Sequence, residues 1–465
     1  MSEKTKKQHK PLNSIALLFL MIIAVTVLSW LIPAGSYDRV ELNGRSAVDP
    51  DSFKFIEADN VSVFDIFLAV PSGMSNAASM LIAALLIGGG MEVLQKSNAM
   101  NIGIARGIRR LGIARGNIVL IFLFYVFALM GAFLGFIEGS IPFIPIAISI
   151  AIALGYDSIV GVAIAMLGAI SGFTCGPTNP YTVGVAQTVA GIGMYSGIGL
   201  RLVLFVILPL VCLIYILAYA KRVSKDPEKS LMAGVDVSDI KFDISSYDSL
   251  AFTGKHAAAL LILLAGIVAY VIGSVKLGFT MLHLGAIFVI IGVAIGIVFG
   301  FGINDTAETF IKGAQGMTGA VFIMGVAYGI SWILTKAKVL DTIVYYLSSP
   351  LKGLSPVISL IGILIVIMLI NLLIPSGSGK ALIVMPIVLP IADIVGINPQ
   401  IATLAYQFGD GITNLCTPLL GVLLLALGFG KVPFNKWEKF ILPIVGIMTV
   451  IACITLVIAM AIGYT

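Results

Sequence analysis

The pattern Gly-x-Thr-Asn-x-x-Thr occurs twice in this chain of 465 residues, at 176–182 and at 411–417, and both copies lie inside long apolar segments. Proline and glycine near these places prevent a regular helix from continuing. Non-helical backbone at membrane depth is tolerated only where protein or a water-filled cavity surrounds it. The two segments are therefore expected to be membrane helices broken at equivalent positions. That arrangement is typical of a carrier with its binding site near the bilayer midplane.

The repetition extends beyond this motif. Gly-Ser dipeptides at 139–140 and 377–378 precede the two copies, and Ile-Leu-Pro follows them at 207–209 and 441–443. Several matches in the same order are typical of a duplicated unit. Six apolar spans lie between the two Gly-Ser dipeptides, whereas inverted repeats need an odd number. Because span counting fails first at broken segments, the repeats are still expected to be inverted.

The composition is that of a polytopic membrane protein. Hydrophobic residues make up 59% of the chain and charged residues 11%, against about 25% charged in an ordinary soluble domain. An all-α fold with eleven spans is predicted from apolar runs near the roughly 20 residues that cross a bilayer. These runs fall at 12–33, 76–95, 117–136, 158–192, 198–220, 256–273, 279–302, 317–335, 355–374, 400–430 and 439–462. Two further stretches, 137–156 and 375–396, contain Gly, Ser and Pro and are interpreted as re-entrant hairpins.

Polar segments divide the chain. Residues 221–255 are expected to be a linker between a first transport repeat with an N-terminal helix, 1–220, and a second transport repeat, 256–465. The net charge of +5 lies largely in short basic tracts beside the spans, which set topology and do not indicate nucleic acid. The four cysteines lie in apolar segments without metal-ligand spacing, so no metal site or cofactor is expected.

Polar side chains at the two breaks are candidates for binding a solute. They are Thr178, Asn179 and Thr182 in the first half and Thr413, Asn414 and Thr417 in the second, where Asp410 adds a negative charge. Freed carbonyls and neutral side-chain oxygens suit a cation, and half-helix dipole ends suit an anion. The alternative is a kink kept for helix packing, because Ser, Thr and Asn often join membrane helices. The duplication favours a binding site.

Charged residues also stand in the openings of the predicted hairpins. Glu138 and Lys380 lie deep in apolar sequence, where an ionised group costs at least about 2.5–3.5 kcal/mol and normally faces a cavity or a partner. Glu138 and Asp410 are candidates for ion or proton coupling, and Lys380 for substrate binding. The alternative is a purely structural pair of Lys380 with Asp410 or Glu138. Nearby candidates to receive a carboxylate are the hydroxyls of Ser140, Ser376 and Ser378, with Gly377 and Gly379 allowing close approach to the backbone.

Three stretches, 375–381 (PSGSGKA), 406–414 (YQFGDGITN) and Lys436-Trp437, resemble the DcuC/YfcC-like family of the ion-transporter superfamily. That family contains anaerobic C4-dicarboxylate carriers and proteins assigned as basic amino-acid antiporters. The resemblance covers nearly the whole chain. It implies two re-entrant hairpins, two broken helices, a scaffold able to form a homodimer, and elevator-like movement of the site. By this resemblance 376–378 would be a hairpin tip.

Two departures from the family pattern bear on ion coupling. The predicted hairpin tips read Glu-Gly-Ser and Ser-Gly-Ser, where related carriers have Ser-Asn-Thr, and Lys380 stands where many members have glutamine. A fixed ammonium near the tip would take the place of a coupling cation. Exchange or proton coupling is therefore favoured over sodium coupling.

The leading hypothesis is a secondary active transporter that moves a small carboxylate-bearing metabolite, a C4-dicarboxylate or an amino acid, across a bacterial cytoplasmic membrane. Lys380 with the hairpin serines would hold the carboxylate, and Asp410 and Glu138 would hold Na+, a proton or an amino group. A basic amino-acid antiporter of the arginine/ornithine type is the alternative. A passive channel is less favoured, because pores usually gather like charges around an axis. An enzyme is not expected, since no nucleophile–base pair stands out.

Overall fold

The computed structural model describes residues 14–42, 45–49, 51–57, 61–103, 106, 113–135, 137–237, 251–277, 279–351 and 353–465. Within them the chain is helical apart from two small ribbons after the first helix. These are antiparallel pairs of β1 (Gly35–Ser36) with β4 (Lys54–Phe55) and of β2 (Arg39–Leu42) with β3 (Arg45–Val48). The prediction of an all-α membrane protein is confirmed in this respect.

The helices of the first half reach into the segment expected to be the linker. They are α1 (Ser14–Leu31), α2 (Val63–Asn76), α3 (Ala78–Lys96), α5 (Ile113–Leu129), α6 (Ile144–Ala153), α7 (Ser158–Cys175), α8 (Val185–Ala190) and α9 (Ile198–Lys225). Helix α9 runs to Lys225 and so extends into the first residues of the predicted linker 221–255. Ser230 of that segment donates to the Asp157 carboxylate, which caps α7 by accepting from the Val160 amide.

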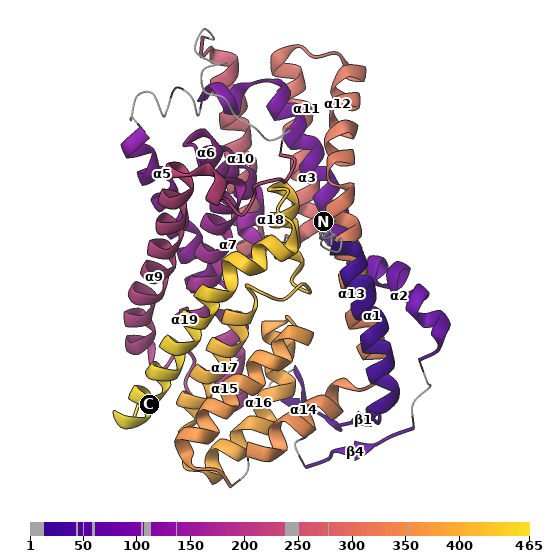
Figure 1. Ribbon diagram of the computed structural model, residues 1–465, viewed down its shortest axis with the longest axis vertical. Coiled ribbons are helices and arrows are strands. Elements are labelled where there is room, and N and C mark those ends of the chain that lie inside the picture. The colour runs from indigo at the N-terminus through magenta and orange to yellow at the C-terminus, as the bar shows by residue number, and fades with distance from the viewer. Residues whose placement is uncertain are drawn as a thin grey trace, which may run out of the picture.

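The second half has ten α-helices in its described residues. They are α10 (Gly254–Leu277), α11 (Met281–Phe299), α12 (Ile303–Gly316), α13 (Thr318–Lys336), α14 (Leu340–Ser348), α15 (Pro356–Leu373), α16 (Gly377–Ile394), α17 (Pro399–Thr413), α18 (Gly421–Phe429) and α19 (Phe434–Ala461). Figure 1 shows α1, α2, α12 and α13 along one side of the molecule, with α5, α9 and α19 along the other.

Helix α2 of the first half packs against α13 of the second, and α12 of the second half packs against α3 of the first. These four helices are called the reciprocal frame. Gly73 of α2 lies so close to α13 that a Cβ there would meet the Gly325 carbonyl oxygen at 2.3 Å. Asp65, at the start of α2, accepts from Lys336, at the end of α13, at 2.5 Å. In the same way Lys96, at the end of α3, pairs with Asp305, at the start of α12. Each half of the chain is thus fastened to the other by an equivalent ion pair.

Asp65 illustrates how the frame is stabilised. Its carboxylate also accepts from the backbone and the hydroxyl of Ser62, which completes a capping box at the start of α2. The hydrogen bond from Lys336 lowers the pKa of Asp65 below its ordinary value, and burial of the carboxyl acts in the opposite direction. The carboxylate is therefore held ionised at this junction.

The structure differs from the predicted span count. Nine helical segments of the described chain are long and apolar enough to cross a membrane, against the expected eleven. The stretches 137–156 and 375–396 are not complete hairpins, since α6 and α16 fill most of them. Each follows a helix, α5 or α15, that the count treated as a separate span. Three shorter apolar helices accompany these nine in the described chain, and apolar length alone does not show where a chain turns, so the expected eleven spans stay a prediction.

Candidate functional site

Both Thr-Asn motifs interrupt a helix, as the sequence predicts. Helix α7 ends at Cys175, and helical structure resumes as a π-helical turn at Pro180–Gly184. The Asn179 side chain bridges the gap by accepting from the amides of Tyr181 and Thr182, at 2.9 and 3.3 Å. Helix α17 ends at Thr413, and α18 begins only at Gly421. Both asparagines of the motifs are buried, Asn179 at 0% and Asn414 at 4% exposure.

The ends of the two broken helices meet. A Cβ on Gly411 would lie 2.3 Å from the Thr174 hydroxyl oxygen, so the last turns of α7 and α17 are in direct contact. A Cβ on Gly377, the first residue of α16, would lie 3.0 Å from the Thr182 side chain and 3.4 Å from Asp410 Oδ2. The second break, the first break and the start of α16 therefore converge on one place.

An ion pair of fully buried residues occupies this place. Lys380 Nζ lies 2.5 Å from Asp410 Oδ1, and both residues have 0% exposure. The contact has the distance of an ion pair but not the geometry of a hydrogen bond, and neither Asp410 oxygen accepts a hydrogen bond from a described residue. The Thr182 hydroxyl is likewise buried without a hydrogen bond among the described residues. These buried oxygens could therefore accept further hydrogen bonds, for example from a bound ligand.

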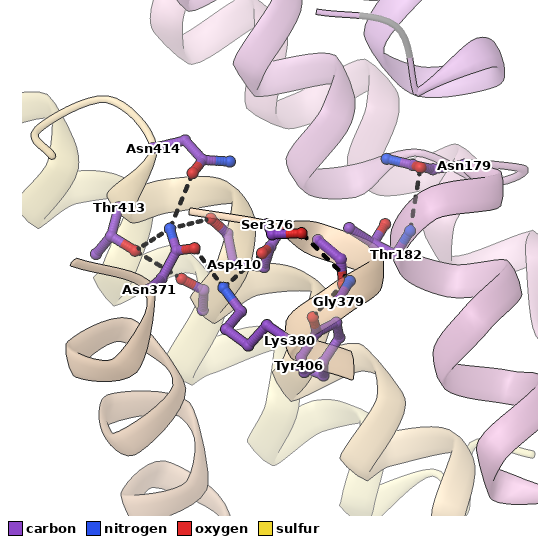
Figure 2. Close-up of polar contacts among 12 residues, drawn as sticks. Asn179, Thr182, Asn371, Ser376, Gly379, Lys380, Tyr406, Asp410, Thr413 and Asn414 are labelled. Carbon is purple, nitrogen blue, oxygen red and sulfur yellow. Dashed lines mark hydrogen bonds and ion pairs between the residues drawn. The ribbon is translucent and has the colours of Figure 1, made fainter. Parts of the chain in front are cut away.

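Asn371, the third residue from the end of α15, ties the pair to the break. Its Nδ2 lies 2.8 Å from the Asp410 carbonyl oxygen and 2.9 Å from both Thr413 Oγ1 and Asn414 Oδ1. Its Oδ1 accepts from Lys380 Nζ. Figure 2 shows this amide between Lys380 and the end of α17. Since the last carbonyls of a helix lack intrahelical partners, Asn371 serves as a side-chain cap of α17 and orients the ammonium.

Other predicted residues hold the surrounding backbone. Ser376 caps α16 by accepting from the Gly379 amide at 3.3 Å. The Tyr406 hydroxyl donates to the Gly377 carbonyl oxygen at 2.5 Å, and Thr417 donates to the Leu372 carbonyl oxygen at 3.1 Å. These contacts fix the turn at 374–376 that joins α15 to α16. The predicted hairpin tip at 376–378 lies across the end of this turn and the start of α16.

Some predicted residues lie apart from the charge pair. Thr178 donates to the Phe133 carbonyl oxygen, and Ser140 donates to the Ile137 carbonyl oxygen. Both hydroxyls therefore bind the backbone between α5 and α6. Ser378 is half-buried at the start of α16. Glu138 begins a short 3-10 helix that ends at Phe143, and its side chain lies outside what the structure describes.

The sequence analysis did not select Asn371, and it also did not select Arg201 and Gln407. Arg201 of α9, with 0% exposure, donates from Nε to Gln407 Oε1 at 3.0 Å and from NH1 to the Ser196 carbonyl oxygen at 2.7 Å. Gln407 in turn donates to the Gly176 carbonyl oxygen, at the first break, at 2.8 Å. The signal available was the arginine itself, an ionisable residue inside the apolar run 198–220.

A separate cavity of about 630 Å³ lies away from the charge pair. Residues from the α12–α13 junction, from α18, from the segment 431–436 and from the turn 233–235 line it. Lys380 and Asp410 do not contribute to its wall. This cavity is therefore not part of the site around the charge pair.

A helical membrane protein with two interrupted helices around buried charges has the architecture of a transporter. Residues 12–461 match the family described as C4-dicarboxylate anaerobic carrier, DcuC, and the chain belongs to this family. The protein is thus a transporter rather than an enzyme.

Curated relatives match along their whole length. A protein of Escherichia coli K12, described as "Putative basic amino acid antiporter YfcC", is 29% identical over 506 residues, which cover 100% of this chain and 99% of the relative. A protein of Haemophilus influenzae, described as uncharacterized, is 27% identical, with 98% of each chain covered.

Two solved structures are similar over most of the chain. The YdaH transporter of Alcanivorax borkumensis gives a TM-score of 0.43 at 18% identity, covering 97% of this chain and 99% of that one. MtrF of Neisseria gonorrhoeae, described within a class of antimetabolite efflux pumps, gives 0.41 at 16% identity, with 97% and 95% covered.

Proposed function

We propose that this protein is a secondary active transporter of a small carboxylate-bearing metabolite, a C4-dicarboxylate or an amino acid, in a bacterial cytoplasmic membrane. The observation that carries the proposal is the buried Lys380–Asp410 pair where the two helix breaks meet. Membership in a family of carriers and the bacterial sources of the relatives support it.

The pair restricts how a substrate can bind. Removing one partner of a buried ion pair leaves an unpaired charge and costs about 3–5 kcal/mol. A ligand that draws the Lys380 ammonium to its own carboxylate must therefore offer Asp410 a replacement. An amino acid does so with its ammonium group, whereas a dicarboxylate requires a proton or a cation at Asp410. The same site would thus bind an amino acid without a coupled cation, or a dicarboxylate together with a proton or a cation.

Lys380 supports exchange or proton coupling over sodium coupling. Its ammonium already supplies a fixed positive charge to Asp410 and to Asn371 Oδ1, oxygens of the kind that would bind Na+. We infer that the empty site stays neutral while the pair is closed, so that Asp410 needs no sodium ion when no substrate is bound. Na+ or H+ remains the ion to be tested at Asp410.

Inverted repeats and elevator-like movement are part of the proposal. The reciprocal pairs Asp65–Lys336 and Lys96–Asp305 support a two-fold relation between the halves. If α5–α6 and α15–α16 are both re-entrant, five spans remain between their turns, an odd number as inversion requires. The frame around α3 and α13 would then be the fixed part, and α7 and α17 with their breaks the moving part.

A basic amino-acid antiporter is the second candidate. The description of the Escherichia coli relative favours it, and so does Asp410, a buried carboxylate that would exchange the Lys380 ammonium for a cationic group of the substrate. A side-chain ammonium or guanidinium of the substrate would bind such a carboxylate well.

Purified protein in liposomes tests both candidates. Counterflow of radiolabelled succinate, aspartate, arginine and ornithine is measured with and without Na+ and with an imposed pH gradient. We expect counterflow of at least one of them without Na+, and its loss in Asp410→Asn. Arg222→Gln, an exposed charge change on α9, is the control. Absence of counterflow for all four substrates in the wild-type protein would contradict the proposal.

A further inference from the structure

Arg201 is a buried cation whose charge nothing in the described chain balances. No Asp or Glu of the described residues lies within ion-pair distance of its guanidinium, and its NH2 has no hydrogen-bond partner there. The Tyr464 ring, 6.0 Å from Cζ, is its aromatic neighbour. An ionised group at membrane depth normally has a partner or faces a path for ions or substrates. Arg201 thus lacks the anion that its position demands.

The free part of the guanidinium has the shape that a carboxylate needs. Nε donates to Gln407, and NH1 spends one hydrogen on the Ser196 carbonyl oxygen. One hydrogen of NH1 and both hydrogens of NH2 remain, and the outer edge of the planar guanidinium carries one hydrogen from each of these two nitrogens. Such an edge binds a carboxylate through two parallel hydrogen bonds.

Arg201 belongs to a belt of buried polar side chains that leads toward the first break. Gln187 donates to Gln400 Oε1 at 2.9 Å, and Gln400 donates to Ser196 Oγ at 2.9 Å. Gln407 continues the belt to the Gly176 carbonyl oxygen. The belt starts beneath the partly exposed loop 191–197. Hydrogen-bonded polar side chains thus connect the loop 191–197 with the place where α7 and α17 meet.

The belt lies one helical turn from the Lys380–Asp410 pair. Gln407, which holds Arg201, and Asp410, which holds Lys380, are three residues apart on α17. Such positions are neighbours on a helix surface, about 5–6 Å apart between Cβ atoms. The partners of the two buried cations, Gln407 for Arg201 and Asp410 for Lys380, therefore lie on the same face of α17.

We propose that Arg201 is a second carboxylate subsite, which binds the far carboxylate of a short diacid while Lys380 binds the near one. The inference rests on the proposed function, and it adds the residue that separates diacids from their monoacid analogues. Gln407 is a positioning residue in this scheme, because it orients the guanidinium and touches the first break.

Succinate and succinamate test the subsite, since they differ only by an amide in place of one carboxylate. Their dissociation constants are measured from ligand-induced thermal stabilisation of the purified protein. We expect the wild type to bind succinate at least about tenfold more tightly than succinamate. Arg201→Gln should reduce this ratio to about one and leave succinamate binding unchanged, whereas Lys380→Gln should weaken both ligands. Arg222→Gln is the control and should keep the wild-type ratio.

Arg201→Lys keeps a point charge without the planar fork, so its ratio should fall between those of wild type and Arg201→Gln. It also serves as the decisive variant if Arg201→Gln does not fold. A wild-type ratio near one, or a ratio unchanged in the Arg201 variants, would overturn the inference. Counterflow of an amino acid without succinate binding would overturn it too, while leaving the proposed function intact.

Discussion

Replacing Asn371 by leucine tests whether its amide holds the broken end of α17. Leucine has a similar size, so the change removes hydrogen bonds without opening a large cavity. The bonds lost are those from Nδ2 to the Asp410 carbonyl oxygen and to the side chains of Thr413 and Asn414. The contact of Lys380 with Oδ1 is lost as well.

The expected magnitude follows from these contacts. An amide group has two hydrogens, so at most two of the three Nδ2 contacts are full hydrogen bonds at one time. The buried Asp410 carbonyl oxygen would lose this partner, and a buried group left without a partner costs about 1–3 kcal/mol. The Lys380 ammonium would keep Asp410 but lose its hydrogen bond to Asn371, and a hydrogen bond to a charged group is worth about 1.5–3 kcal/mol. Thr413 and Asn414 can turn to other partners. With some gain from burying leucine, we expect the free energy of unfolding to fall by about 2–5 kcal/mol.

Unfolding in detergent, followed by intrinsic fluorescence against denaturant, gives this free energy. Thr449→Val is the matched control, because the Thr449 hydroxyl donates only to the Val445 carbonyl oxygen of its own helix. The control should change stability by less than about 1 kcal/mol. If Asn371→Leu is no more destabilising than Thr449→Val, the capping role assigned to Asn371 is wrong.

Three further outcomes are expected. Lys380→Met and Asp410→Asn should each destabilise the protein by about 3–5 kcal/mol, and the double variant by clearly less than their sum, because it restores neutrality. Gly411→Val should destabilise by about 1–3 kcal/mol in the same unfolding assay, since its side chain would collide with Thr174. Asp65→Asn should cost about 1.5–3 kcal/mol at neutral pH. Because the folded-state pKa of Asp65 is lowered, this difference should persist above the unfolded value and vanish as the pH falls through the folded one.

Each of these outcomes has its own control. Gly446→Val places the same side chain where a Cβ meets nothing within 4 Å, and it should leave stability nearly unchanged. Asp38→Asn removes a carboxylate whose pair with Lys54 is exposed, so a pH dependence equal to that of Asp65→Asn would count against the assignment. Strict additivity of the Lys380 and Asp410 changes would show that the two charges do not interact.

The sequence predicted the breaks because Gly and Pro at 176–180 have local consequences for any helix. It also placed Lys380 and Asp410 correctly inside apolar segments. Their pairing, left open between a structural and a binding role, depends on how α16 and α17 pack, which local sequence does not determine. That the candidate residues contact a substrate remains a prediction.

Arg201 and Asn371 show what escaped the sequence. Each lies outside the duplicated motifs, so the repeat gave no reason to select it. Asn371 lies in an apolar run that is typical of an ordinary membrane helix. Its amide finds hydrogen-bond partners only because α15 packs against the end of α17. The re-entrant hairpins stay a prediction for a related reason, because the helices α5 and α15 that precede α6 and α16 are as apolar as membrane spans.

The reciprocal frame has a consequence for biosynthesis. The lysine that pairs with Asp65 is made 271 residues after it, and the hydroxyl of Thr309, which Lys96 also contacts, 213 residues after Lys96. The amino-terminal half therefore reaches the membrane before Asp305 and Lys336, the ion-pair partners of Lys96 and Asp65, are synthesised. It cannot form these pairs until the second half has been translated. Co-expressed as two separate polypeptides divided in the segment 238–250, the halves should find each other and assemble, whereas either half produced alone should be degraded.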